Sequence, residues 1–279
     1  MLRSENITCY DFNAIIHPDS DKYKQKHRAE EKKMQERNYT EINSKTWDKW
    51  SEEGNEWSVP ISREEYANAR KGAWGVYLTP EKCVPKEWFG DLKGKKLLGL
   101  ASGGGQQMPV FCALGAECTV FDNSEKQLES ERLVSGREGY PIRIIKGDMT
   151  KLLPFEDCSF DIIFHPVSNC YIEDVYHVWN ECFRVLKDGG ILLAGMDNGI
   201  NFLFNDDGTL PLTIENKLPF NPLKMSGEEF ARMAENFDGI QFSHTLEEQV
   251  SGQLKAGFIL TGLYEDRDRW GLLREYTPQ

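Results

Sequence analysis

One stretch, Lys96 to Asp122, constrains the fold more than any other part of the chain. Its first apolar run, Leu97 to Ala101, opens into three consecutive glycines, and a second apolar run, Thr119 to Phe121, ends on an acid. A helical pattern that starts at Pro109 joins the two runs. This order of strand, glycine turn, helix and strand predicts the first half of a nucleotide-binding α/β unit.

The same alternation continues to residue 196. Pro141 to Lys146 and Phe160 to Phe164 are predicted as the third and fourth strands, and Val175 to Leu186 shows the apolar spacing of one helix face. We expect Lys187–Gly190 to end that helix and Ile191 to Met196 to form a fifth strand, buried on both faces. The predicted class is therefore α/β, a Rossmann-like, doubly wound and mostly parallel sheet with helices on both faces.

Residues 197–224 interrupt the alternation and form an insertion after the fifth strand. Asp206–Gly208 is predicted as a hairpin turn within it, and its position at the carboxyl end of a parallel strand makes it a candidate lid. Further on, Leu246, Val250 and Leu254 share a predicted helix face, and Phe258 to Tyr264 is predicted as a sixth strand.

We divide the chain into three parts. Residues 1–40 form a charged N-terminal arm, residues 41–93 an aromatic-rich helical cap segment, and residues 94–279 the α/β domain. The cap segment holds five of the seven tryptophans, and together they could line a pocket or cover it. For any single aromatic residue, packing onto the sheet is the favoured interpretation.

Composition excludes several classes of function. A net charge of −12 over 279 residues argues against a surface built mainly for nucleic acid or anionic lipid. Neither an apolar run near 18 residues nor the apolar core of a signal peptide is found, so we expect a soluble, cytoplasmic protein without a membrane anchor. The seven cysteines include no Cys-x-x-Cys pair, so we expect neither structural zinc nor a disulfide framework, and no metal site.

The glycine turn has two chemical interpretations. In a dinucleotide fold the glycines approach a pyrophosphate, and an acid about 20 residues on binds the ribose. In a methyltransferase fold a similar turn packs against S-adenosylmethionine, and Asp122, nineteen residues after Gly103, would hold the ribose hydroxyls. A second acid, Asp148, follows the third strand with Met149 beside it, and this favours the cationic, phosphate-free ligand.

The order and spacing of five motifs resemble the class I S-adenosylmethionine-dependent methyltransferases. The motifs are Leu97–Gln107, Thr119–Asp122, Lys146–Met149, Leu153–Ile163 and Arg184–Leu193. The resemblance covers residues 94–196 well and 245–264 loosely. It implies S-adenosylmethionine as cofactor and leaves the acceptor open, with small-molecule or unassigned acceptors in the most similar members.

The resemblance also implies roles for individual residues. Candidate cofactor contacts are Ala101, Ser102, Gly103, Gly104, Gly105, Gln106, Asp122, Asn123, Gly147, Asp148, Met149 and His165. Candidate catalytic or acceptor-orienting residues are His165, Asn169 and Tyr171, after the fourth strand. His165 is interpreted as a base or acceptor contact, or as a residue that hydrogen-bonds the loop or the cofactor.

The sequence departs from the family in three places. Gly99 stands where the family usually has an acid, and Ala101 stands where a glycine opens the turn. Backbone carbonyls, Ser102 or a group from the cap segment would then hold the methionine ammonium. The family's final antiparallel strand has no counterpart before Gln279, so we expect either a truncated chain or an arm in its place.

The predicted function is methyl transfer from S-adenosylmethionine to a small-molecule acceptor by in-line displacement, in which the protein supplies proximity and alignment. One alternative is a non-catalytic S-adenosylmethionine-binding regulatory module. An NAD-dependent oxidoreductase is the other. Overall acidity disfavours a nucleic-acid acceptor, although residues 19–37 carry local Lys and Arg, and the oligomeric state is not predicted.

Overall fold

The computed structural model describes residues 37–204, 213–235 and 239–266. Contacts divide the chain into Met1–Asn38 and Tyr39–Gln279, and the helices and strands of the described residues belong to the second unit. The charged arm expected over residues 1–40 lies almost wholly outside the described residues, as does the turn expected at Asp206–Gly208. Near that turn, Phe204 and Ile214 form an isolated antiparallel bridge.

The centre of this unit is a parallel sheet in the order β3-β2-β1-β4-β5. Its strands are β1 (Lys96–Leu100), β2 (Glu117–Asp122), β3 (Arg143–Lys146), β4 (Phe160–His165) and β5 (Leu186–Ala194). The order reverses between β1 and β4, and in such sheets ligands bind at the carboxyl ends of the strands beside this point. The Rossmann-like α/β prediction is confirmed.

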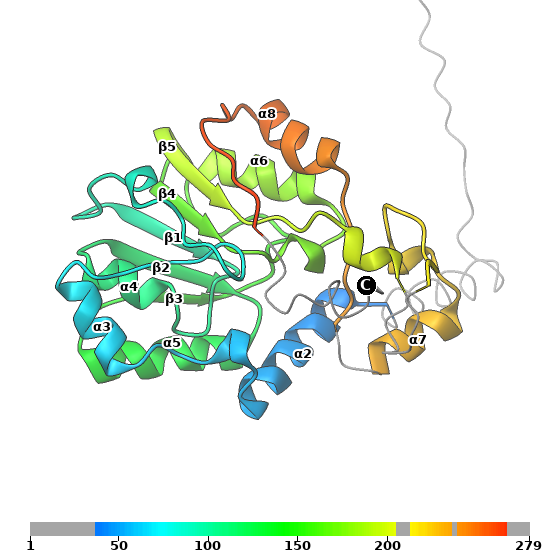
Figure 1. Ribbon diagram of the computed structural model, residues 1–279, viewed down its shortest axis with the longest axis horizontal. Helices are drawn as coiled ribbons and strands as arrows, with labels where there is room; N and C mark the ends of the chain where they lie inside the picture. Colours follow the sequence, from blue (N-terminus) through cyan, green and yellow to red (C-terminus); the bar gives the residue numbers. More distant parts are fainter. Residues whose placement is uncertain (1–36, 205–212, 236–238, 267–279) are drawn as a thin grey trace, which may run out of the picture. The chain divides into compact units, whose positions relative to one another are not determined.

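Helices cover both faces of the sheet (Figure 1). One face carries α3 (Arg63–Arg70), α4 (Met108–Ala113) and α5 (Glu125–Glu138), and the other carries α6 (Val175–Val185) and α8 (Gly252–Ala256), which a π-helical turn, Glu247–Ser251, precedes. The two remaining α-helices of the described residues are α2 (Tyr39–Glu53) and α7 (Gly227–Glu235). Short 3-10 turns lie at Glu56–Ser58, Lys86–Trp88, Asn169–Tyr171, Ile200–Leu203 and Pro222–Lys224.

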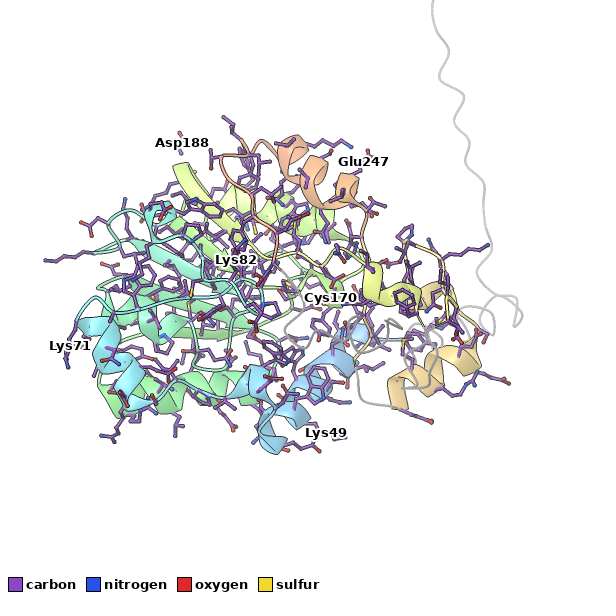
Figure 2. The ribbon with its side chains drawn as sticks, in the orientation of Figure 1. Lys49, Lys71, Lys82, Cys170, Asp188 and Glu247 are labelled. Atoms are coloured by element: carbon purple, nitrogen blue, oxygen red, sulfur yellow. The ribbon has the colours of Figure 1, made fainter. Side chains whose placement is uncertain are left out.

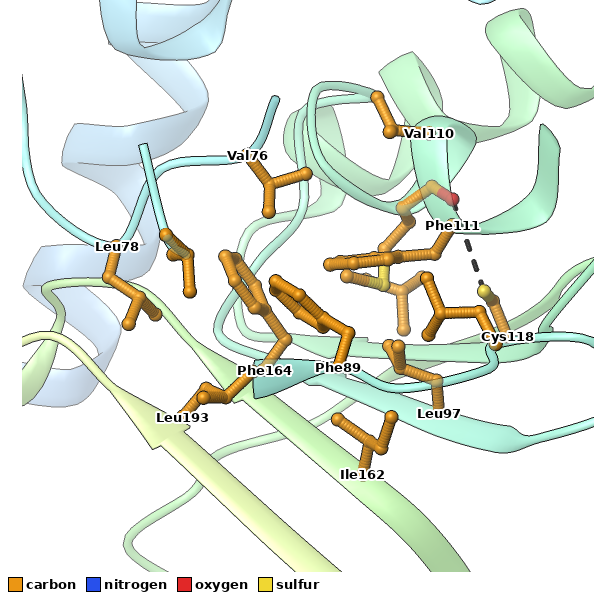
Figure 3. Packing of buried hydrophobic residues seen from close by; sticks show 14 of the residues in the cluster. Val76, Leu78, Phe89, Leu97, Val110, Phe111, Cys118, Ile162, Phe164 and Leu193 are labelled. Carbon is orange, nitrogen blue, oxygen red and sulfur yellow. Dashed lines mark hydrogen bonds between the residues drawn. The ribbon is translucent and has the colours of Figure 1, made fainter. Parts of the chain in front are cut away.

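Successive residues of β1 point to opposite faces, as a strand requires. Leu97 joins the core on the α4 side, whereas Leu98 and Leu100 join the core on the α6 side. Figure 3 shows the first of these cores, in which Phe111 of α4 lies edge-on to Phe164 of β4 with 5.1 Å between ring centroids. Residues that precede β1 complete the same core, namely Val76, Leu78, Val84, Phe89 and Leu92.

The junction between α6 and β5 differs from the prediction. Lys187–Gly190 was expected to end the helix and to precede the strand, but β5 begins at Leu186, directly after α6. Phe160 pairs with Leu186 and Ile162 with Ile191, so the extra residues form a bulge in the edge strand. Apolar spacing does not report such a bulge, because the bulged residues are polar and glycine.

The prediction of a sixth strand at Phe258–Tyr264 is wrong, because this described segment has no regular secondary structure and does not join the sheet. It instead packs on the cap segment, where Tyr264 contacts Trp88 and the Asp266 carboxylate accepts from the backbone N–H groups of Glu81 and Lys82. An apolar extended pattern predicts strand conformation but not a hydrogen-bonded neighbour. The helix expected around Leu246 and Leu254 is present, although both side chains are exposed.

Candidate cofactor and active site

The glycine turn follows β1 in a conformation that explains its composition. Ala101 has φ 48°, in the left-handed region that an alanine adopts at some cost, and its N–H donates to Phe121 O at 2.8 Å. Gly104 and Gly105 also have positive φ, at 93° and 69°. A Cβ at Gly103 would lie 2.7 Å from Gln127 Cβ and 3.0 Å from Asp122 Oδ2. The loop therefore needs glycine where α5 and the end of β2 approach it.

Asp122 ends β2 beside this loop. Its Oδ2 accepts from Gly103 N–H at 2.9 Å, and its Oδ1 accepts from Ser124 N–H at 2.9 Å. Burial raises the pKa of the Asp122 carboxyl above its usual range, and the bonds from backbone N–H groups oppose that rise. The residue is half-buried: its carboxylate contacts the glycine loop, and the residue also lines the cavity.

The end of β3 places the second acid at the same edge. Gly147 N–H donates to Asp122 O at 2.9 Å, and the ring of Phe121 occupies the space that a side chain at Gly147 would need. Asp148 Oδ1 accepts from Thr150 N–H at 2.8 Å, which fixes the turn after the strand. Asp148 and Met149 both face the cavity that Asp122 and the glycine loop line.

The lining of one cavity includes residues at the carboxyl ends of the strands and continues along β5. The candidates that line it are Ala101, Ser102, Gly103, Gln106, Asp122, Asn123, Gly147, Asp148, Met149 and Tyr171. Four candidates, Gly104, Gly105, His165 and Asn169, lie behind its wall. The structure thus brings together residues that are far apart in the sequence, and it separates His165 from Tyr171, only six residues away.

His165 ends β4 with its side chain turned inward, 0% exposed. Its Nδ1 donates to Leu100 O at 2.9 Å, and its Nε2 lies 2.7 Å from Asn169 Oδ1. The ring also meets Trp179 of α6 edge-on. Burial lowers the pKa of the imidazole below its usual value, and the two hydrogen bonds oppose that shift. In this arrangement it supports the turn after β4.

Three comparisons with known proteins bear on this site. The family model described as "Methyltransferase domain" matches residues 98–194. The uncharacterized methyltransferase YbaJ of Bacillus subtilis (strain 168) is 46% identical over 228 residues, which cover 81% of this chain and 89% of that protein. This chain belongs to the S-adenosylmethionine-dependent methyltransferases. The methyltransferase is therefore an enzyme with S-adenosylmethionine as its cofactor.

Two more similarities cover smaller parts of the methyltransferase. The ubiquinone/menaquinone biosynthesis C-methyltransferase UbiE of Cereibacter sphaeroides (strain ATCC 17029) is 32% identical over 117 residues, and the chain spans less than half, 46%, of that relative. The crystal structure of an S-adenosylmethionine-dependent methyltransferase from Mesorhizobium loti matches at 18% identity with a TM-score of 0.48, over 63% of this chain and 80% of that one. Among the described residues, no helix is long and apolar enough to cross a membrane.

The cavity of the methyltransferase fits its cofactor. Asp122 and Asp148 place carboxyl oxygens in the cavity wall, and these acceptors suit the hydroxyl and amine donors of an adenosyl group. Ser102 Oγ, in the same wall, is buried and has no hydrogen-bond partner among the described residues. A buried hydroxyl without a partner is costly, and a polar ligand atom would satisfy it.

The cap segment closes one side of the methyltransferase site. Asn123 Nδ2 donates to Thr40 O at 2.8 Å, and Ser44 Oγ donates to Asn123 O at 2.7 Å, so Asn123 fastens α2 to the end of β2. Asp48 of α2 accepts from Ser124 Oγ at 2.6 Å, at the start of α5. Trp47 and Trp50 of α2 line the cavity, and Trp47 meets Tyr171 edge-on with 5.7 Å between ring centroids.

Two neighbouring glutamines join the glycine loop to the rest of the cap segment. Gln106 Nε2 donates to Val59 O at 3.1 Å, and Gln107 Oε1 accepts from Tyr77 N–H at 3.1 Å. Sequence reasoning chose Gln106 as a cofactor contact and missed Gln107. The Gln106–Gln107 pair could have predicted this role, because two amide side chains directly after a glycine turn can hydrogen-bond to backbone groups of a neighbouring segment.

Glu131 of α5 is a second residue that sequence reasoning missed. Its carboxylate accepts from Gly105 N–H at 2.8 Å, underneath the glycine loop. Position 131 lies three residues after Leu128 and three before Val134, both buried, so helical spacing placed this acid on the buried face. The many other charges of α5 concealed that signal.

Proposed function

We propose that this methyltransferase acts on a small-molecule acceptor by in-line displacement, within a recess between the sheet and a lid. Trp47 and Trp50 of α2 line this recess, and α2 carries the lid, which consists of α7 and the residues around Phe242. It has its own small core, in which Phe230, Ile240 and Phe242 pack with Tyr39 and Ile42. The observation that carries the proposal is the attachment of this lid to the body of the enzyme.

The attachment is made by Asn43 of α2, which is buried. Its Oδ1 accepts from Ile240 N–H at 2.6 Å, and its Nδ2 donates to Ile240 O at 2.9 Å and to Tyr171 O at 3.3 Å. One side chain therefore joins α2, the lid and the turn after β4. A lid held on both sides suits an enclosed small acceptor better than a flat macromolecular surface, because pockets for small ligands are concave and largely preformed.

The proposed cofactor contacts follow from the chemistry of the lining residues. When bound, S-adenosylmethionine supplies an electrophilic methyl group on a positively charged sulfur. Asp122 accepts hydrogen bonds from the ribose hydroxyls, Asp148 accepts from the adenine amine, and Met149 packs on the ring. Ser102 Oγ binds the methionine end, in place of the acid that the family has at the position of Gly99.

The space beside Gly99 supports this assignment of Ser102. A Cβ at Gly99 would lie 2.5 Å from Met108 Sδ, so the first turn of α4 fills the volume that an acidic side chain would need. Ser102 is three residues further on, and its hydroxyl is buried in the cavity wall. The chain thus replaces a carboxylate in β1 with a hydroxyl in the loop.

On the acceptor side, the chain's contribution is alignment and exclusion of water. Tyr171 lines the cavity against Trp47, and we assign it the acceptor contact. His165 and Asn169 act from behind the wall, through their mutual bond, to hold the turn that carries Tyr171. If the acceptor must lose a proton, either a residue of this turn removes it or the acceptor loses it to water before it binds.

Acceptor identity does not transfer from the relatives. UbiE is named for C-methylation in ubiquinone and menaquinone biosynthesis, but the chain spans 46% of that protein. The family match over residues 98–194 leaves out α2 and the lid. We therefore assign acceptor choice to α2, the lid and Tyr171.

The test is a turnover screen with the full chain. The protein is incubated with S-adenosylmethionine and pooled metabolites, and release of S-adenosylhomocysteine is measured by mass spectrometry. Acceptor-dependent release that Trp47→Ala reduces, with unchanged affinity for S-adenosylhomocysteine by calorimetry, supports the proposal. Release that depends on protein or nucleic acid substrates and on none of the small molecules contradicts it.

A further inference from the structure

Glu131 is a buried acid that the proposed chemistry does not use. It lies on α5 behind the glycine loop, with 0% of its surface exposed. Its Oε1 accepts from Gly105 N–H at 2.8 Å, whereas its Oε2 is buried and has no hydrogen-bond partner among the described residues. Glu131 does not line the cavity, so it cannot touch the cofactor directly.

The groups around Glu131 favour its neutral form. Asp122 faces it from the end of β2, Cys118 faces it from the same strand, and Tyr140 faces it from the segment after α5. None of these three groups carries a positive charge that would stabilise the Glu131 carboxylate. The Tyr140 hydroxyl is also buried and has no hydrogen-bond partner among the described residues. Burial, together with Asp122, raises the pKa of Glu131 to about 8, against the bond from Gly105.

Gly105 is where Glu131 acts on the loop. Its N–H is held by Glu131, and its carbonyl oxygen accepts from Ile61 N–H at 3.0 Å. With φ 69°, a Cβ at Gly105 would lie 3.0 Å from Ser130 O, so the loop passes directly over α5. Ser102 and Gly103, which line the cavity, are three and two residues away along a tight turn.

We propose that Glu131 is a positioning residue for cofactor binding, which holds the glycine loop from behind through the N–H of Gly105. The inference rests on the proposed contact between this loop and S-adenosylmethionine. Loss of this buried hydrogen bond would cost more free energy than loss of an exposed one, because water cannot reach the Gly105 N–H and replace the lost acceptor. Loss of the acceptor at residue 131 therefore shifts Ser102 and Gly103 from their binding positions.

The experiment measures the affinity of the full chain for S-adenosylhomocysteine by calorimetry at pH 7. Glu131→Met removes the acceptor at similar volume, and we expect binding at least tenfold weaker. Glu131→Gln keeps a carbonyl oxygen for Gly105 and mimics the neutral acid, so its affinity stays within about threefold of wild type. Leu128→Ala is the matched control, because Leu128 is a buried residue of the same helix in the general core, and its affinity stays unchanged despite lower stability.

A pH series tests whether the oxygen acceptor, rather than its charge, holds the loop. From pH 7 to pH 9 the affinities of wild type and Glu131→Gln change in parallel, within about threefold of each other, because residue 131 keeps an oxygen for the Gly105 N–H in both proteins. Affinity retained by Glu131→Met, lost equally by Leu128→Ala, or lost by Glu131→Gln contradicts the role of Glu131. If Asp122→Ala also binds normally, the assignment of the loop to the cofactor fails, and the inference fails with it.

Discussion

The N–H of Gly103 donates to Asp122 Oδ2 at 2.9 Å, and this bond joins the turn after β1 to the acid that ends β2. The two residues lie nineteen positions apart in the sequence, at the ends of neighbouring strands. Asp122 therefore shapes the glycine loop as well as facing the cavity. A change at Asp122 affects the loop and the ligand together.

Asp122→Ala is expected to weaken binding of S-adenosylhomocysteine at least tenfold, or about 1.4 kcal/mol. The variant loses the proposed ribose contact and leaves the N–H groups of Gly103 and Ser124 without their acceptor. Calorimetry on the full chain gives the affinity. Glu247→Gln is the control, since this exposed acid lies at the edge of the molecule (Figure 2) and does not line the cavity, and it should bind as wild type does. Equal affinities for both variants would contradict the assigned site.

Gly99→Ala is expected to lower the free energy of unfolding by about 1–3 kcal/mol, the usual cost of overpacking a core. The added Cβ would meet Met108 Sδ at 2.5 Å and Met108 Cε at 2.9 Å. Urea denaturation of Gly99→Ala, Met108→Ala and the double variant completes a cycle. The double variant should be more stable than the sum of the single effects predicts, because the shortened side chain makes room. Additive effects would mean that Met108 does not occupy this space in solution.

Gln107→Met should loosen the cap segment at Tyr77, because it removes the acceptor of the Tyr77 N–H. A hydrogen bond of this kind contributes about 0.5–1.5 kcal/mol, so amide exchange at Tyr77 should become roughly 3- to 10-fold faster. Hydrogen exchange resolved to single residues measures the effect. Gln106→Met, whose native amide instead bonds Val59 O, should leave Tyr77 as protected as in wild type. Unchanged exchange in Gln107→Met would refute this anchor.

His165 should make the protein less stable as the pH falls below 6.5. Burial lowers the pKa of the folded imidazole, so the unfolded chain takes up a proton that the folded chain resists. The unfolded state then binds more protons, and the free energy of unfolding falls by up to about 1.4 kcal/mol per pH unit in the window between the folded pKa and 6.5. Urea denaturation from pH 7 to pH 5 should show a shallower loss for His165→Gln. Identical slopes would show that His165 titrates normally when folded.

Much of the fold follows from local pattern. The alternation of apolar runs with helical spacing from Leu97 to Ala194 predicted five parallel strands, and all five are present. Since the carboxyl ends of parallel strands share one edge, the positions of Asp122 and Asp148 at strand ends were enough to predict that both face one site. The limit of the pattern appears at Phe258–Tyr264, where an extended run found no strand to pair with among the described residues.

The sequence by itself determined the α/β class, the glycine turn and the two acids, because strand and helix periodicity and glycine stereochemistry act over a few residues. Tertiary structure alone decided which way a strand-end side chain turns: His165 packs inward against Trp179, while Tyr171, six residues later, faces the cavity. It also decided that Asn43 joins α2 to Ile240, and that one acid of a charged helix, Glu131, lies under Gly105. These outcomes depend on contacts between residues far apart in the chain, whose energies no local pattern contains.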